Sequence, residues 1–156
     1  MRRRPQLVEF ATDEVGEVVA LMDELADGSG WINIRPAVDP DDLPPNGGRP
    51  TFISAVGPLV PLCTWTPAQL GRRPTPPLIG IQHAAGGKAA PELGSLGVAV
   101  PDGWRVVQDE SRRGLVVAVA PSLPSGPVLA WLLAAGGALC SVPFSGWVAA
   151  VYRRTR

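Results

Sequence analysis

The stretch GLVVAVAPSLPSGPVLAWLLAAGGALCSVPFSGWVAAVY, from Gly114 to Tyr152, contains no charged side chain and is followed by Arg153-Arg154-Thr155-Arg156. Because a solvent-exposed surface normally carries charge, this stretch must be buried in the protein, packed against a second copy, or placed in lipid. A membrane-spanning helix needs about 20 apolar residues. Val128 to Val142 is shorter than that, contains Gly136-Gly137 and is followed at once by Pro143. We therefore do not expect a membrane span and predict burial in a soluble protein.

Two strands and a helix account for the uncharged stretch. Leu115 to Val119 and Trp147 to Tyr152 are apolar on both faces, which is typical of strands that are covered on both sides. Between them, Pro127 suits the first turn of a helix that reaches about Cys140 and is apolar all round. We therefore expect the sheet to have no bare face, so either the first 75 residues or a second subunit must cover it.

Three further elements are expected before the uncharged stretch. Leu78 to Gln82 and Trp104 to Gln108 are short strand-like runs, and Ala84 to Leu96 is helical in pattern although Gly86, Gly87 and Pro91 disturb it. The order over residues 77–153 is then β-α-β-β-α-β. This order matches the split βαβ, ferredoxin-like arrangement.

The N-terminal portion, residues 1–75, is expected to add a helix and short strands. The helix covers about residues 13–26, with Thr12 as its cap and Gly28 at its end. Strands are predicted at residues 31–35 and, as two short pieces joined at Gly57-Pro58, within 52–65, and residues 37–50 are expected to form a loop. Pro61 favours an edge position for the second piece. The prediction is one α+β domain, 1–156, whose N-terminal helix and short strands pack on a ferredoxin-like C-terminal half.

Charge and cysteine content narrow the class of protein. Residues 1–42 carry most of the acids, and the remainder of the chain is basic, although the formal net charge of the 156 residues is +0. This asymmetry indicates either an anionic partner for the basic part or, as we favour, packing of the two parts on each other. Cys63 and Cys140 are far apart and fit buried, reduced thiols. No apolar stretch follows Met1-Arg2-Arg3-Arg4, so we expect a cytoplasmic protein.

The candidate site residues lie around the only histidine. His83 follows a predicted strand and precedes a Gly-rich turn, where ligand contacts are common. If the strands starting near 78 and 104 are neighbours, a polar ligand-binding cluster would form from Gln82, His83, Trp104, Arg105 and Gln108. The competing interpretation, which we favour, is that His83 has a structural role and that the polar side chains of the 104–108 strand are simply exposed on an edge strand. One His and two distant Cys give no metal-ligand spacing, and no cofactor is expected.

No motif in the chain reaches catalytic specificity, since neither a G-x-S-x-G nor a G-x-G-x-x-G pattern is present. The preferred hypothesis is a non-catalytic binding or protein-interaction module, with self-association through the sheet or the 127–140 helix. One alternative is a small enzyme with His83 as general base and an Arg as anion clamp. The other is an accessory protein that binds nucleic acid through its arginines. Nucleic acid is disfavoured because the strands look covered, leaving only Trp104, Trp147 and Tyr152 to stack bases.

Overall fold

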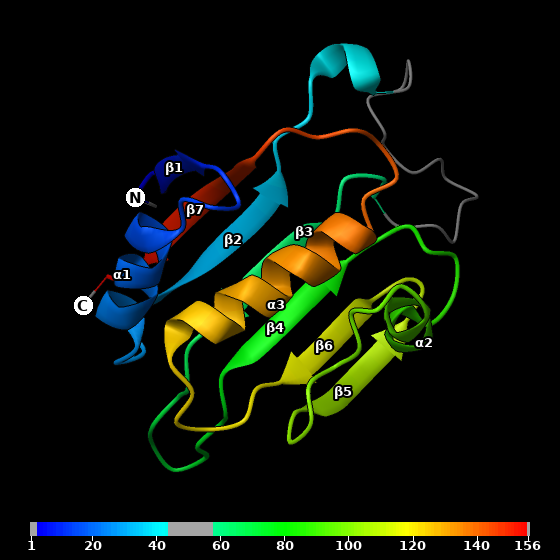
Figure 1. The fold of residues 1–156 in the computed structure, drawn as a ribbon. Helices are drawn as coiled ribbons and strands as arrows, with labels where there is room; N and C mark the ends of the chain where they lie inside the picture. The colour runs from blue at the N-terminus through cyan, green and yellow to red at the C-terminus, as the bar shows by residue number, and fades with distance from the viewer. Residues whose placement is uncertain (1–2, 44–57, 156) are drawn as a thin grey trace.

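The uncharged stretch folds as a strand, a helix and a strand in the computed structural model of the protein, which describes residues 3–43 and 58–155 (Figure 1). These residues form three α-helices, one 3₁₀ helix and seven strands. In chain order they are β1 (Gln6–Phe10), α1 (Gly16–Leu25), β2 (Gly30–Pro36), η1 (Pro40–Asp42), β3 (Leu62–Thr66), β4 (Leu78–Gln82), α2 (Ala89–Ser95), β5 (Arg105–Glu110), β6 (Gly114–Ala118), α3 (Ser125–Ala138) and β7 (Trp147–Arg153).

All seven strands belong to one antiparallel sheet in the order β1-β7-β2-β3-β4-β6-β5. The strands of the N-terminal portion are therefore part of the same sheet as those of the C-terminal portion. β7 lies between β1 and β2, and β3 joins β2 to β4 (Figure 1). The described part of the chain is a mixed α+β structure with a single sheet.

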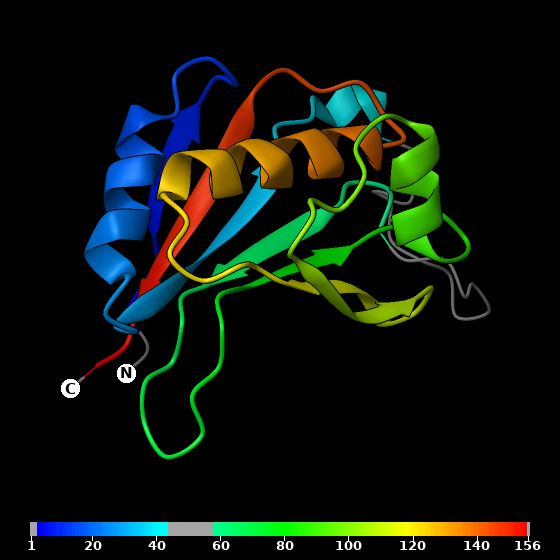
Figure 2. The ribbon, with the colours of Figure 1, turned by 60° about the horizontal axis from the view of Figure 1, so that its bottom comes forward.

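The three helices lie on one side of the sheet (Figure 2). α3 crosses the central strands, α1 lies beside it over the β1-β7 side, and α2 covers the β5-β6 side. The core fills the space between these helices and the sheet, with Val18, Ile32, Ile79, Leu129 and Leu132 each fully buried. Burial of such large apolar side chains contributes about 1.5–3 kcal/mol each, so this single layer of contacts supplies most of the stability.

A close approach fixes α3 on the sheet. A Cβ atom at Gly136 would lie 2.8 Å from the Cys63 Sγ of β3 and 3.5 Å from the Trp147 ring of β7. The second distance is an ordinary contact, but the first is too short for a Cβ, so a residue without a side chain lets the helix come this near to Cys63. The pair Gly136-Gly137, which weakens a membrane helix, therefore has a packing role in this fold.

The predicted β-α-β-β-α-β order is confirmed from β4 to β7. The predicted helix at 84–96 is shorter than expected, because Gly86 has φ +76 and α2 begins only at Ala89. β1 was not predicted from the sequence. Its short run alternates weakly, with Val8 and Phe10 buried and Glu9 exposed between them.

Several expectations for the N-terminal portion need correction. Thr12 does not cap α1; its Oγ1 instead accepts a hydrogen bond from Trp147 Nε1 at 2.9 Å, and the helix starts after Val15. β3 is a central strand rather than an edge strand, because Pro61 precedes it and removes no ladder hydrogen bond. The piece predicted before Gly57-Pro58 lies outside the described residues.

The expectation that the first 75 residues cover the second face of the sheet is wrong for the described residues. β1, β2 and β3 extend the sheet edge to edge, and α1 joins the other helices on the face that is already covered (Figure 2). Within residues 3–43 and 58–155, no helix is long and apolar enough to cross a membrane.

The close approach at Gly136 predicts a large effect of one methyl group. Gly136→Ala should lower the free energy of unfolding by about 1–3 kcal/mol, because the new Cβ must displace the Cys63 side chain or the helix itself. The matched control is Gly126→Ala in the same helix, where a Cβ meets nothing within 4 Å. That variant should be neutral or gain up to about 1 kcal/mol from helix propensity. Urea unfolding of both variants checks this, and equal stabilities would contradict the proposed packing role.

Candidate functional site on the open face of the sheet

The five residues predicted to form a polar cluster do not converge. His83 and Trp104 lie on the helix side of the sheet, where Trp104 contacts Trp131 of α3 edge to face at 5.4 Å. Gln82 is exposed at the end of β4, opposite Leu62 of β3. Arg105 is exposed on β5, and the Gln108 amide donates to the backbone oxygen of Arg113 at 3.1 Å within the β5-β6 hairpin.

His83 is buried and only 1% exposed. Its Nδ1 accepts a hydrogen bond from the backbone N–H of Ala85 at 3.1 Å, so the neutral ring carries its proton on Nε2, which has no partner among the described residues. Burial lowers the pKa of His83, and the nearby Asp109 carboxylate opposes that shift. A ring so enclosed, with one nitrogen occupied, gives no geometric support to a general base that acts on a bound substrate.

Asp109 is the structural partner in this region, although it was not among the predicted site residues. Its two carboxylate oxygens accept hydrogen bonds from the backbone N–H groups of Ala89 and Ala90, at 2.7 and 3.0 Å. These two N–H groups belong to the first turn of α2 and have no partner inside the helix. The Asp109 carboxylate, which lies on β5, therefore caps the N-terminus of α2. We interpret the His83–Asp109 region as an anchor for α2.

Buried His83 predicts a specific pH dependence. Because its pKa is lowered in the folded protein, the unfolded chain takes up the proton first, and stability is lost as the pH falls below 6.5. His83→Asn keeps an acceptor for Ala85 but does not titrate. Thermal unfolding between about pH 7.5 and pH 5.5 should therefore show a larger fall in Tm for the natural protein than for the variant. Identical profiles would contradict this, since the chain has no other histidine.

The cysteine thiols do not add a nucleophile. Burial raises the pKa of Cys63 to about 12, and the Cys140 thiol acts in the same direction. Both cysteines are free, and Cys63 lies directly beneath α3. A protonated thiol in this position packs as a small apolar group. No group of three or more His, Cys, Asp or Glu that could hold a metal occurs in the described part of the chain.

The side of the sheet away from the helices, called here the open face, carries no second layer of described residues (Figure 2). One row of side chains runs across all seven strands through directly paired positions, and every member is uncharged. The row consists of Leu7, Ala150, Asn33, Thr64, Gly80, Val116 and Gln108. The Thr64 hydroxyl donates to Asn33 Oδ1 at 2.9 Å, which links the two polar side chains at the centre of the row. The row across the middle of the open face is therefore uncharged.

The residues next to this row along β1, β7 and β2 differ on its two sides. On one side, Glu9 and Arg35 flank Val148 on neighbouring strands. On the other side, Trp31 and Tyr152 lie next to each other on β2 and β7, with ring centroids 5.2 Å apart and ring planes 6° from parallel. Both rings are only partly buried, so they provide an aromatic surface on the open face.

A groove of ≈ 650 Å³ lies on the aromatic side of the row, where the two ends of the described chain meet. This terminal groove is lined by the Trp31–Tyr152 pair and by arginines from both termini, which are Arg3, Arg4, Arg153 and Arg154. The backbone N–H of Arg154 donates to Ser29 O at 2.8 Å, which holds the C-terminal segment beside β2. Basic and aromatic side chains are thus gathered in one place.

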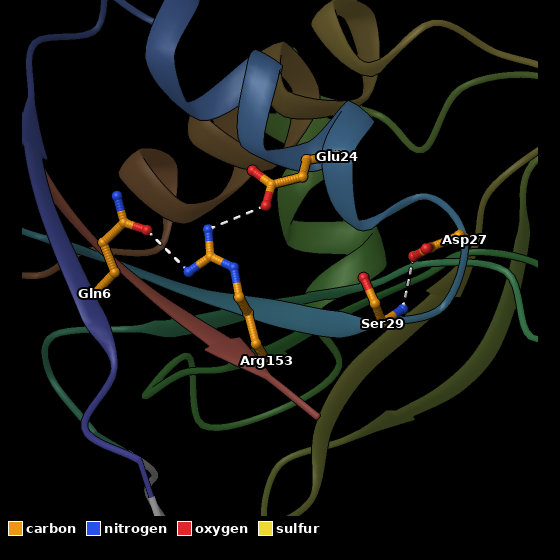
Figure 3. Close-up of polar contacts among 5 residues, drawn as sticks. All are labelled: Gln6, Glu24, Asp27, Ser29 and Arg153. Atoms are coloured by element: carbon orange, nitrogen blue, oxygen red, sulfur yellow. Dashed lines mark hydrogen bonds and ion pairs between the residues drawn. The ribbon is translucent and has the colours of Figure 1, made fainter. Parts of the chain in front are cut away.

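Arg153 is held differently from its neighbours. Its Nη1 donates to Gln6 Oε1 at 2.9 Å, and its Nη2 lies 3.4 Å from Glu24 Oε1 of α1 (Figure 3). Arg3, Arg4 and Arg154 are exposed and have no carboxylate partner among the described residues. Arg153 therefore ties β7 to β1 and α1, while the other three leave their charges available to a ligand.

The sequence contains only part of the signal for the terminal groove. In the sequence, Tyr152 is a candidate for base stacking and the terminal arginines are candidates for phosphate contact. No local pattern marks Trp31 as a stacking residue. Trp147, a further candidate for stacking, is 2% exposed and faces the core. Comparisons with protein-family models, curated proteins and solved structures gave no match for this chain. A function must therefore be inferred from the geometry of the chain itself.

Proposed function

We propose that the protein is a non-catalytic binding module that takes an anionic partner on the open face of its sheet. The observation that carries this proposal is the terminal groove, where three arginines without a carboxylate partner among the described residues surround a stacked aromatic pair. Helix α1, which carries Glu17, Asp23 and Glu24, lies on the opposite, helix-covered side of the sheet, and Glu24 is paired with Arg153. This separation of charge favours approach of an anion from the open side.

Face-to-face self-association fits the open face less well than an anionic partner does. Arg35 and the three available arginines of the groove outnumber Glu9 on the β1-β7-β2 side. A second copy would bring the same excess of positive charge to the interface, and like charges facing each other are costly. Self-association through α3 stays a prediction that a single chain does not test.

We also infer that residues 77–153 form a ferredoxin-like unit whose sheet has been widened. Without β1, β2 and β3, the strand order reads β7-β4-β6-β5, with the two crossing helices on one side. β2 and β3 then lie between the first and last strands of that unit. This insertion is what places Trp31 beside Tyr152.

Retention on immobilised heparin, a generic polyanion, tests the proposed function. The natural protein should bind at low salt and elute as salt is raised, and Arg4→Gln/Arg154→Gln should elute earlier because the groove then carries two fewer positive charges. The matched control is Arg112→Gln/Arg113→Gln, which removes two exposed charges from the turn at the far edge of the sheet. Failure of the natural protein to bind heparin, or equal shifts in both variants, would overturn the proposal.

A further inference from the structure

We propose that the anionic partner is single-stranded nucleic acid, and that the terminal groove binds it by stacking a base on the Trp31–Tyr152 pair. This inference rests on the proposed function, because it names the ligand of the same face. Three features of the groove carry it: the rigidity and accessibility of the aromatic pair, the placement of the free arginines, and the uncharged floor that continues from the groove.

The aromatic pair is fixed before any ligand arrives. Trp31 and Tyr152 are directly paired residues in the β2-β7 ladder, which runs without a break from Gly30–Arg153 to Pro36–Trp147. Their near-parallel rings stack on each other, which restricts both side chains, and both remain partly exposed. A preordered ring surface loses little conformational entropy on binding, and a base that stacks on such a surface gains about 1–3 kcal/mol irrespective of its identity.

The free arginines lie where the phosphates of a stacked nucleotide would need them. Arg3 and Arg4 reach the groove from the segment before β1, and Arg154 reaches it from the segment after β7. The first segment continues the β1 edge next to β7, and Arg154 lies beyond Tyr152 at the end of β7, beside Ser29 of the β2 side. A chain whose base stacks on the pair therefore has cationic groups within reach of its phosphates. Guanidinium groups also suit phosphate oxygens through paired N–H donors.

The uncharged row next to the groove favours an extended strand over a compact ligand. Seven strands spaced by about 4.8 Å make the open face roughly 29 Å wide, which accommodates several nucleotides. Gly80 and Ala150 keep this floor low, and Thr64 with Asn33 offers polar atoms without charge. No acid lies in the row to repel a phosphate backbone.

A single strand fits this site better than a duplex does. The bases of a duplex are stacked inside the helix, so they are not available to stack on the Trp31–Tyr152 rings. A duplex would meet only the arginines, and binding would then be independent of Trp31. The dependence on Trp31 therefore separates the two ligands.

Fluorescence anisotropy with labelled oligonucleotides of about twelve nucleotides, dT and U in separate arms, tests the proposal. The natural protein should bind the single strand more tightly than the duplex of the same length. Trp31→Leu should weaken binding on the order of tenfold, because the base loses the ring on which it stacks. In Arg4→Gln/Arg154→Gln, the slope of log affinity against log salt should become shallower by about 0.7 for each phosphate that is no longer neutralised.

Trp104→Leu is the matched control, because it removes a partly buried tryptophan on the helix side and should leave binding unchanged. Circular dichroism and urea unfolding establish that each variant is folded. Equal affinity for duplex and single strand, or unchanged binding by folded Trp31→Leu, would overturn the nucleic-acid inference while heparin binding still supported the proposed function. Binding to vesicles of anionic lipid, with no binding to either oligonucleotide, would overturn it as well. Absence of heparin binding would instead remove the proposed function itself.

Discussion

The contact of α3 with the sheet at Gly136 is the constraint on which the rest of the structure depends. The helix comes within van der Waals distance of β3 and β7 at that residue, so its large side chains fill the space over the central strands. α1 then lies beside α3, and the Ser125 hydroxyl donates to Asp23 Oδ1 at 2.6 Å where the two helices meet. Because one layer of helices buries the whole core, the other face of the sheet needs no cover for the fold to form.

The fold was predictable from the sequence wherever a local pattern determines it. Short apolar runs separated by turns identify β4, β6, α3 and β7, and the spacing of apolar residues identifies α1. Local patterns did not reveal whether one face or both faces of the sheet are covered. In β7, Ala149 and Val151 are buried, whereas Val148 and Ala150 are only partly buried on the open face. Side chains of the same chemical type stand on both faces, so the absence of charge does not distinguish a covered face from an uncharged exposed one.

The candidate site was beyond the reach of sequence patterns for a different reason. The terminal groove is built from Arg3, Trp31 and Arg154, which only the pairing of β1 and β2 with β7 brings together. Such pairings are set by the three-dimensional order of strands, which local periodicity does not encode. The predicted cluster around His83 failed for the same reason. Its members were expected on one side of neighbouring strands, but the chain places them on both faces of the sheet.

Strand alternation explains how neighbouring arginines at the end of β7 acquire different roles. Arg153 has the same parity as Val151, which faces the helices, and so it meets Glu24 of α1. Tyr152 has the opposite parity and stands on the open face beside Trp31. Arg154 follows the last strand residue and is held by Ser29 O at the rim of the groove. In this short basic segment, Arg153 therefore ties β7 to β1 and α1, whereas Arg154 contributes to the proposed site.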